Sequence, residues 1–183
     1  MKTDLALIYV GEGVGGAAMI NGELYRGVSN ASGEIGHCTV DINGDMCSCG
    51  NRGCLQTKTN KKAMLKMASQ LGIDATTCDD IVEKALNGDA LCNKIIETQA
   101  MYLSIGVKML TNMYNPKLVI INSDIKDFDK VILDKICALC KVANSFGNEC
   151  EIKYGSQNSM SVIRGATAMI LKEIFNDPFS YFN

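Results

Sequence analysis

The hydrophobic pattern up to about residue 42 has the period of two that is typical of strands. An apolar run at 5–10 leads into a glycine-rich turn at 11–16, and short alternating runs flank the pair Asn21-Gly22. That pair predicts a tight hairpin turn, because both residues tolerate positive φ. We therefore predict strands over residues 5–10, 17–20, 23–25 and 37–42.

From Leu55 onward the period changes to about 3.6, which predicts helices over residues 57–71, 79–86 and 89–114. A short apolar run at 118–121 indicates a buried parallel strand, and a helix at 128–144, a strand at 151–154 and a helix at 160–175 follow. Strands in a meander, then helices alternating with single strands, indicate an α/β fold in one domain over residues 1–183. The longest helix is ended by Asn115-Pro116, and its buried stripe is expected to be Cys92, Ile96, Ala100, Leu103, Val107, Leu110 and Tyr114.

Composition and charge fit a globular domain and exclude several classes of protein. Hydrophobic residues make up 47% of the chain and charged residues 21%, both ordinary values. The net charge of −2 argues against nucleic-acid binding through bulk electrostatics. No apolar stretch has the length of a membrane span and no signal peptide opens the chain, so we expect no membrane association and a cytoplasmic location.

The nine cysteines are the unusual feature of the composition. Their number is odd and the chain is not small, so metal binding accounts for some of them better than a disulfide framework does. One glycine-rich segment offers an imidazole and three thiols, the ligand set of a four-coordinate zinc site: His37, Cys47, Cys49 and Cys54. We call residues 37–54 the metal loop.

The alternative for the metal loop is that its cysteines are small buried hydrophobes, but a polar, glycine-rich loop has little apolar core for them to join. Cys137 and Cys140 lie at helical spacing in an amphipathic stretch, so we expect them to be core residues. We also expect a structural role for the other four, Cys38, Cys78, Cys92 and Cys150.

Glu34 and His37 are candidates for binding a carbohydrate. A zinc-bound imidazole keeps one ring N–H, whose direction the metal fixes. A carboxylate three residues earlier can accept hydrogen bonds from two hydroxyls at once. The pair therefore suits vicinal hydroxyls of a pyranose, while the alternative for Glu34 is an ordinary exposed loop carboxylate.

The segment from about residue 6 to 60 resembles the ROK family of repressors, open reading frames and sugar kinases. The resemblance depends on Gly11-x-Gly13-Val14-Gly15-Gly16, on Asn21-Gly22-Glu23-Leu24-Tyr25-Arg26-Gly27, on Gly33-Glu34-Ile35-Gly36-His37 and on Cys47-x-Cys49-Gly50-x-x-Gly53-Cys54-Leu55. It implies an actin-like, ribonuclease-H-like sugar-kinase lobe with a zinc-binding loop, and a hexose site within about residues 33–56. It also implies a homodimer or higher oligomer.

The chain departs from the pattern of the kinase members at several positions. Gln56 stands where a glutamate usually follows Cys-Leu, and Glu12 replaces a hydroxyl residue in the glycine turn. A carboxylate repels a phosphate by about 4 kcal/mol at ~4 Å and an effective dielectric of 20, which argues against ATP binding. Asn122-Ser123 replaces a pair of glycines, and the catalytic aspartate of the kinases comes from a segment before the opening strand. These departures favour a chain that is not an enzyme.

The sequence thus predicts the sugar-binding and oligomerisation domain of a ROK-type transcriptional regulator, stabilised by zinc. The expected sugar ligands are Glu34, His37 and Gln56, and DNA would be bound only by an amino-terminal domain that this chain lacks. One alternative is the carboxy-terminal lobe of an ATP-dependent ROK sugar kinase. Another is an interaction module that keeps zinc but binds no sugar.

Overall fold

A mixed five-stranded sheet with the order β3-β2-β1-β4-β5 forms the centre of the computed structural model, which describes residues 4–141 and 150–155. β1 (Leu5–Val10), β2 (Val14–Ile20) and β3 (Glu23–Leu24) form an antiparallel meander. β4 (Leu118–Ser123) and β5 (Glu151–Tyr154) are parallel to β1. The predicted α/β class is therefore confirmed.

The turn between β2 and β3 is the one that the sequence predicted. Asn21 and Gly22 have φ values of 54° and 78°, the left-handed conformation that a tight hairpin requires. β2 begins at Val14, three residues earlier than predicted, so the second half of the glycine-rich run is strand. Gly16 pairs with Ile8 in the middle of the antiparallel ladder.

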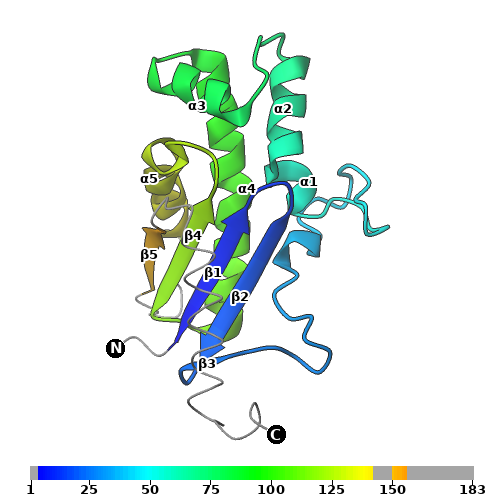
Figure 1. Cartoon of the computed structure of the whole chain (residues 1–183), viewed down its shortest axis with the longest axis vertical. Coiled ribbons are helices and arrows are strands. Elements are labelled where there is room, and N and C mark those ends of the chain that lie inside the picture. Colours follow the sequence, from blue (N-terminus) through cyan, green and yellow to red (C-terminus); the bar gives the residue numbers. More distant parts are fainter. Residues whose placement is uncertain (1–3, 142–149, 156–183) are drawn as a thin grey trace, which may run out of the picture.

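One face of the sheet packs on the long helix α4 (Ala90–Tyr114), which lies behind β1, β2 and β4 in Figure 1. Alternate residues of β1 and β4 are buried, among them Ile8 and Ile121, as the period-two pattern requires. Every residue of the stripe predicted for this helix is buried except Tyr114, which is partly buried. Asn115 closes the helix in the left-handed conformation, with φ 45°.

The remaining helices extend this core. α5 (Phe128–Lys141) packs beside α4, while α2 (Lys61–Gln70) and α3 (Cys78–Leu86) lie beyond the end of the sheet that carries the β1–β2 turn (Figure 1). The predicted helix 57–71 is divided into α1 (Gln56–Thr59) and α2. The break occurs because Asn60 is extended and its side chain caps α2, accepting from the Ala63 N–H at 2.8 Å.

The predicted strand 37–42 is wrong. Residues Ile35–His37 form a short 3-10 helix, η1, and the metal loop after it projects away from the sheet beside α1 (Figure 1). The N–H groups of Val40 and Asp41 both donate to the Gly53 carbonyl, within the loop itself. The backbone is therefore used to fold the loop on itself. The predicted helix 160–175 lies outside the described residues.

Candidate metal centre and the adjoining carboxylate

Four potential ligand atoms from the metal loop converge on one point in the structure. The Sγ atoms of Cys47, Cys49 and Cys54 and a ring nitrogen of His37 all lie within 4.8 Å of one another. Cys47 Sγ is 3.5 Å from His37 Nδ1, and Cys49 Sγ is 3.6 Å from Cys54 Sγ. The structure thus brings together the four residues that the sequence predicted.

Two of these separations are close to those of a tetrahedral zinc site. Bonds of about 2.3 Å to sulfur and about 2.0 Å to nitrogen at tetrahedral angles place two sulfurs ~3.8 Å apart, and a sulfur and a nitrogen ~3.5 Å apart. The sulfur–sulfur contact at 3.6 Å and the sulfur–nitrogen contact at 3.5 Å are close to those edges. The donor set of three thiols and one imidazole is also one that zinc prefers.

Glycines allow the metal loop to fold tightly enough to bring the ligands together. Gly53 has a φ of 68°, and a Cβ there would stand 1.5 Å from the Asp41 carbonyl oxygen. The N–H of Cys47 donates to the Asn51 carbonyl at 2.8 Å, which closes the turn between the first two cysteines and the third. Arg52 donates from Nη1 to the Gly44 carbonyl at 2.9 Å, so it stabilises the loop backbone.

The thiols of the cluster differ in acidity. Burial works to raise the pKa of Cys47, but hydrogen bonds from Cys49, His37 and Cys54 lower it to about 6. Burial and the neighbouring thiols of Cys49 and Cys47 raise the pKa of Cys54 to about 12. One thiolate therefore forms easily in this cluster, and a bound divalent cation would favour loss of the other protons.

Helix α1 connects the metal loop to the core. Leu55, next to Cys54 of the cluster, is fully buried, and its Cδ2 lies 2.9 Å from where a Cβ on Gly106 of α4 would stand. Lys58 forms an ion pair with Asp41 at 2.8 Å, and its Nζ lies 5.5 Å from the centre of the Tyr102 ring. These contacts hold the loop against the middle of α4.

Gln56, predicted to bind a sugar, lies beside Cys47 of the cluster. Its Nε2 is 3.1 Å from Cys47 Sγ and 3.5 Å from Ser48 Oγ. Its Oε1 faces the glycine turn, 3.7 Å from the position that a Cβ on Gly13 would take. No local pattern in the sequence predicts this contact with sulfur, because it depends on where α1 begins relative to the loop.

Glu34 and His37 come together as predicted. His37 Nε2 is 3.8 Å from Glu34 Oε2, while Nδ1 of the same ring faces Cys47. The Glu34 side chain is 65% exposed and that of His37 33%, so both can be reached from solvent. One imidazole therefore joins the candidate metal cluster on one side to an open carboxylate on the other.

Close backbone contacts fix the segment that carries Glu34 and His37. The Gly16 N–H donates to the Gly33 carbonyl at 2.7 Å, which ties the segment to β2. A Cβ on Gly36 would lie 1.9 Å from the Val14 carbonyl oxygen. A pocket of about 220 Å³ adjoins this segment, between β2 and the end of α4, with Tyr25, Glu34 and Met113 among its lining residues.

The glycine turn carries an ion-pair network that the sequence does not reveal. Lys61 Nζ lies 2.6 Å from Asp124 Oδ2 and 3.9 Å from Glu12 Oε1. Asn60 Nδ2 donates to the Glu12 carbonyl at 3.0 Å, and the Lys61 N–H donates to the Gly11 carbonyl at 3.0 Å. Lys61 thus forms ion pairs that hold the glycine turn near α2. Together with Glu12 and Asp124 it lines an open hollow of about 760 Å³.

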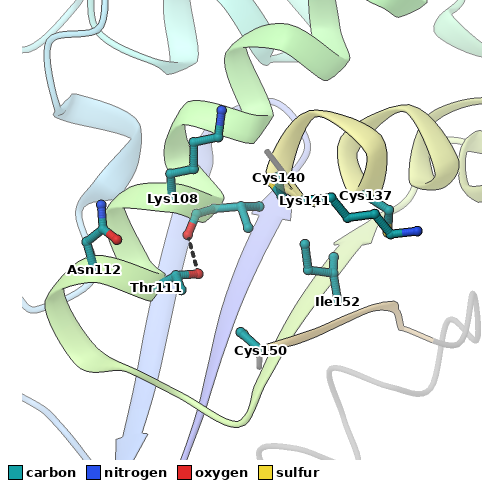
Figure 2. A pocket seen from close by; sticks show the side chains of 9 residues that line it. Lys108, Thr111, Asn112, Cys137, Cys140, Lys141, Cys150 and Ile152 are labelled. Atoms are coloured by element: carbon teal, nitrogen blue, oxygen red, sulfur yellow. Dashed lines mark hydrogen bonds between the residues drawn. The ribbon is translucent and has the colours of Figure 1, made fainter. Parts of the chain in front are cut away.

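Cys137 and Cys140 line a separate, smaller pocket of about 140 Å³. Figure 2 shows both on α5, with Cys150 just before β5 and with Thr111 and Lys108 on α4. Cys140 packs against the core, and burial raises the pKa of its thiol to about 11. Within the part of the chain that the structure describes, the metal-loop cluster is the one group of His, Cys, Asp and Glu side chains placed to hold an ion.

The sequence profile of the ROK family matches residues 2–173. The chain belongs to the ROK family. It is 28% identical over 191 residues to the xylose repressor of Caldicellulosiruptor bescii, covering 96% of this chain and 48% of that protein. It is 30% identical over 184 residues to the DNA-binding transcriptional dual regulator NagC of Escherichia coli, covering 94% of this chain and 45% of that protein.

Among solved structures, the ROK family glucokinase from Streptomyces griseus, in complex with glucose and AMPPNP, superposes with a TM-score of 0.78 at 22% identity. The match covers 87% of this chain and 57% of the glucokinase. This likeness supports a sugar-kinase-like α/β fold. The chain spans about half the length of the curated relatives it matches. None of the described helices is both long and apolar enough to cross a membrane.

Proposed function

We propose that this chain is the sugar-binding and oligomerising part of a ROK transcriptional regulator, with a zinc ion in its metal loop. The observation that carries the proposal is the position of the His37 ring. Its Nδ1 lies 3.5 Å from Cys47 Sγ in the cluster, and its Nε2 lies 3.8 Å from the exposed Glu34 carboxylate. The same ring can therefore bind a metal and present an N–H to a ligand.

His37, Cys47, Cys49 and Cys54 would hold the zinc ion, which supplies a fixed imidazole orientation and a stable loop. Glu34 would accept hydrogen bonds from adjacent hydroxyls, and His37 would donate from Nε2. Gln56 would contribute its Oε1 as a neutral acceptor, since its amide N–H groups face the metal loop. This arrangement suits the hydroxyls of a pyranose.

Two observations favour a regulator over a kinase. The relatives that match are named as a xylose repressor and a DNA-binding regulator. The glycine turn carries the Glu12 carboxylate, 85% exposed, near a second carboxylate, Asp124, that already holds Lys61. Two carboxylates would oppose a bound polyphosphate, with a repulsion of about 4 kcal/mol per pair at ~4 Å and an effective dielectric of 20.

The likeness to a glucokinase fold keeps a sugar kinase as the second candidate.

In the regulator, sugar binding would shift the arrangement of the lobes in a homodimer or higher oligomer and so bias attached DNA-binding domains. Those domains would belong to a part of the protein outside this chain. Such a regulator acts in the cytoplasm.

The test is thermal unfolding of the full-length protein with a panel of sugars: xylose, glucose, N-acetylglucosamine and its 6-phosphate. A sugar at about 100 times its Kd adds ~2.7 kcal/mol of stability, which raises the Tm of a protein about twice the length of this chain by a few °C. Glu34→Gln should abolish the shift, while Glu83→Gln, an exposed glutamate on α3, should keep it. If a sugar raises the Tm of Glu34→Gln as much as that of the unsubstituted protein, the proposed sugar site is refuted. Phosphorylation of a sugar with ATP shows a kinase instead.

A further inference from the structure

Gln56 makes a contact with the metal loop that binding a sugar would not require. Its Nε2 lies 3.1 Å from Sγ of Cys47, one of the three candidate thiolate ligands. The Nε2 group carries two hydrogens, and its second neighbour is Ser48 Oγ at 3.5 Å. Both donors of the amide are thus directed at the metal loop.

The orientation of the amide follows from charge. A thiolate accepts hydrogen bonds, so the N–H side of the amide must face Cys47, and the carbonyl oxygen must face away. The structure has this arrangement, because Gln56 Oε1 lies towards the glycine turn, 3.7 Å from the Cβ position of Gly13. A glutamate in place of Gln56 would have no hydrogen to offer the sulfur.

Cys47 is the buried thiol that the Gln56 amide contacts. The His37 ring nitrogen Nδ1 stands 3.5 Å from its sulfur. The residue is buried, with Cys47 only 7% exposed, so water cannot replace a lost donor easily. A further N–H from Gln56 adds to the donors around this sulfur.

We infer that Gln56 is a positioning residue for the metal, which holds the Cys47 thiolate through an N–H···S hydrogen bond. Hydrogen bonds of this kind to ligand atoms orient them, and their removal costs about 10–100-fold in metal affinity. The inference rests on the proposed metal site and goes beyond it. Gln56 would serve the metal with its nitrogen and leave only its oxygen to a sugar.

The test compares zinc release from the full chain and from Gln56→Met, which keeps the length of the side chain and removes the N–H. Gln70→Met is the matched control, because Gln70 is exposed and is the last residue of α2. Zinc is transferred to an excess of a chromogenic chelator, and far-ultraviolet circular dichroism confirms that each variant is folded. We expect release at least about 10-fold faster for Gln56→Met and unchanged for Gln70→Met.

The absorption spectrum of the Co²⁺ form distinguishes a hydrogen bond from Gln56 to Cys47 from simple space filling by the side chain. In the Co²⁺-substituted protein, loss of an N–H donor raises the electron density on the sulfur, so the sulfur-to-cobalt charge-transfer band should move to longer wavelength in Gln56→Met. Gln56→Glu, which also lacks the N–H, should show the same direction of shift. If the zinc-release rate and the Co²⁺ spectrum of Gln56→Met match those of the unsubstituted chain, the inference is overturned, but the proposed metal site is not. Absence of bound zinc from the unsubstituted chain overturns both.

Discussion

The close approach of Gly36 to β2 leads to a specific prediction about the position of the segment that carries Glu34 and His37. A Cβ at this residue would stand 1.9 Å from the Val14 carbonyl oxygen and 3.1 Å from the Val14 Cβ. Both atoms belong to the first residue of β2, which cannot rotate away as a flexible side chain can. Gly36→Ala must therefore push η1 outward by about 1.5 Å to restore ordinary contact.

That displacement has a cost and a functional consequence. Overpacking of a tight contact destabilises a protein by about 1–3 kcal/mol, and a rigid backbone neighbour places this substitution at the upper end. For a chain of this size, a loss of ~2–3 kcal/mol lowers the Tm by roughly 4–12 °C. Because η1 carries His37 and adjoins Glu34, zinc content and sugar-induced stabilisation should fall as well.

Gly15→Ala is the matched control. Gly15 lies on β2 itself, but a Cβ there would meet nothing within 4 Å. Its Tm should change by no more than about 2 °C, since substitutions without a steric conflict stay within ~0.5 kcal/mol. Thermal unfolding of both variants by circular dichroism, in the presence of zinc, gives the comparison. If Gly36→Ala is as stable as Gly15→Ala, the close packing of η1 on β2 is refuted.

Two further predictions concern acid and thiol chemistry. Hydrogen bonds from the backbone N–H groups of Thr77 and Thr76 lower the pKa of Asp80 to about 2. The Asp80 carboxylate therefore stabilises α3 fully at pH values above its pKa in the unfolded chain, about 3.9. This stabilisation is lost as the pH falls towards 2. Amide hydrogen exchange in α3 should therefore accelerate between about pH 4 and 2, and an Asp80→Asn variant should show no such step. Chelation should add about three to the number of thiols that react with Ellman's reagent, from the metal loop, while Cys38 reacts in both states. An unchanged thiol count after chelation would contradict the ligand assignment.

Local patterns in the sequence were enough to predict most of the sheet and helices. The stripe of α4 follows the 3.6 period closely, and β4 follows from an apolar run ended by polar residues. The four members of the cluster could be identified as well, because three thiols and an imidazole in a polar, glycine-rich loop match the donor set of zinc and have little apolar core to join. Each of these features is specified within one stretch of chain.

The features that could not be predicted depend on contacts between distant segments. Residues 37–42 have a strand-like pattern, but the N–H groups of Val40 and Asp41 bond to Gly53 within the loop. The Lys61–Asp124 ion pair joins residues that are 63 positions apart, and no periodicity indicates it. Gln56 could be expected to face a sugar but not the Cys47 sulfur, since that contact requires the folded loop.

The metal content of Cys49→Ala and Cys38→Ala tests the central claim most directly. Cys49 is a member of the four-atom cluster, whereas Cys38 is an exposed cysteine next to His37 that lies outside it. Elemental analysis of the purified full chain should find about one zinc per chain, retained in Cys38→Ala and lost in Cys49→Ala. Equal zinc in both variants, or none in the unsubstituted chain, would contradict a metal site built from His37 and these three thiols.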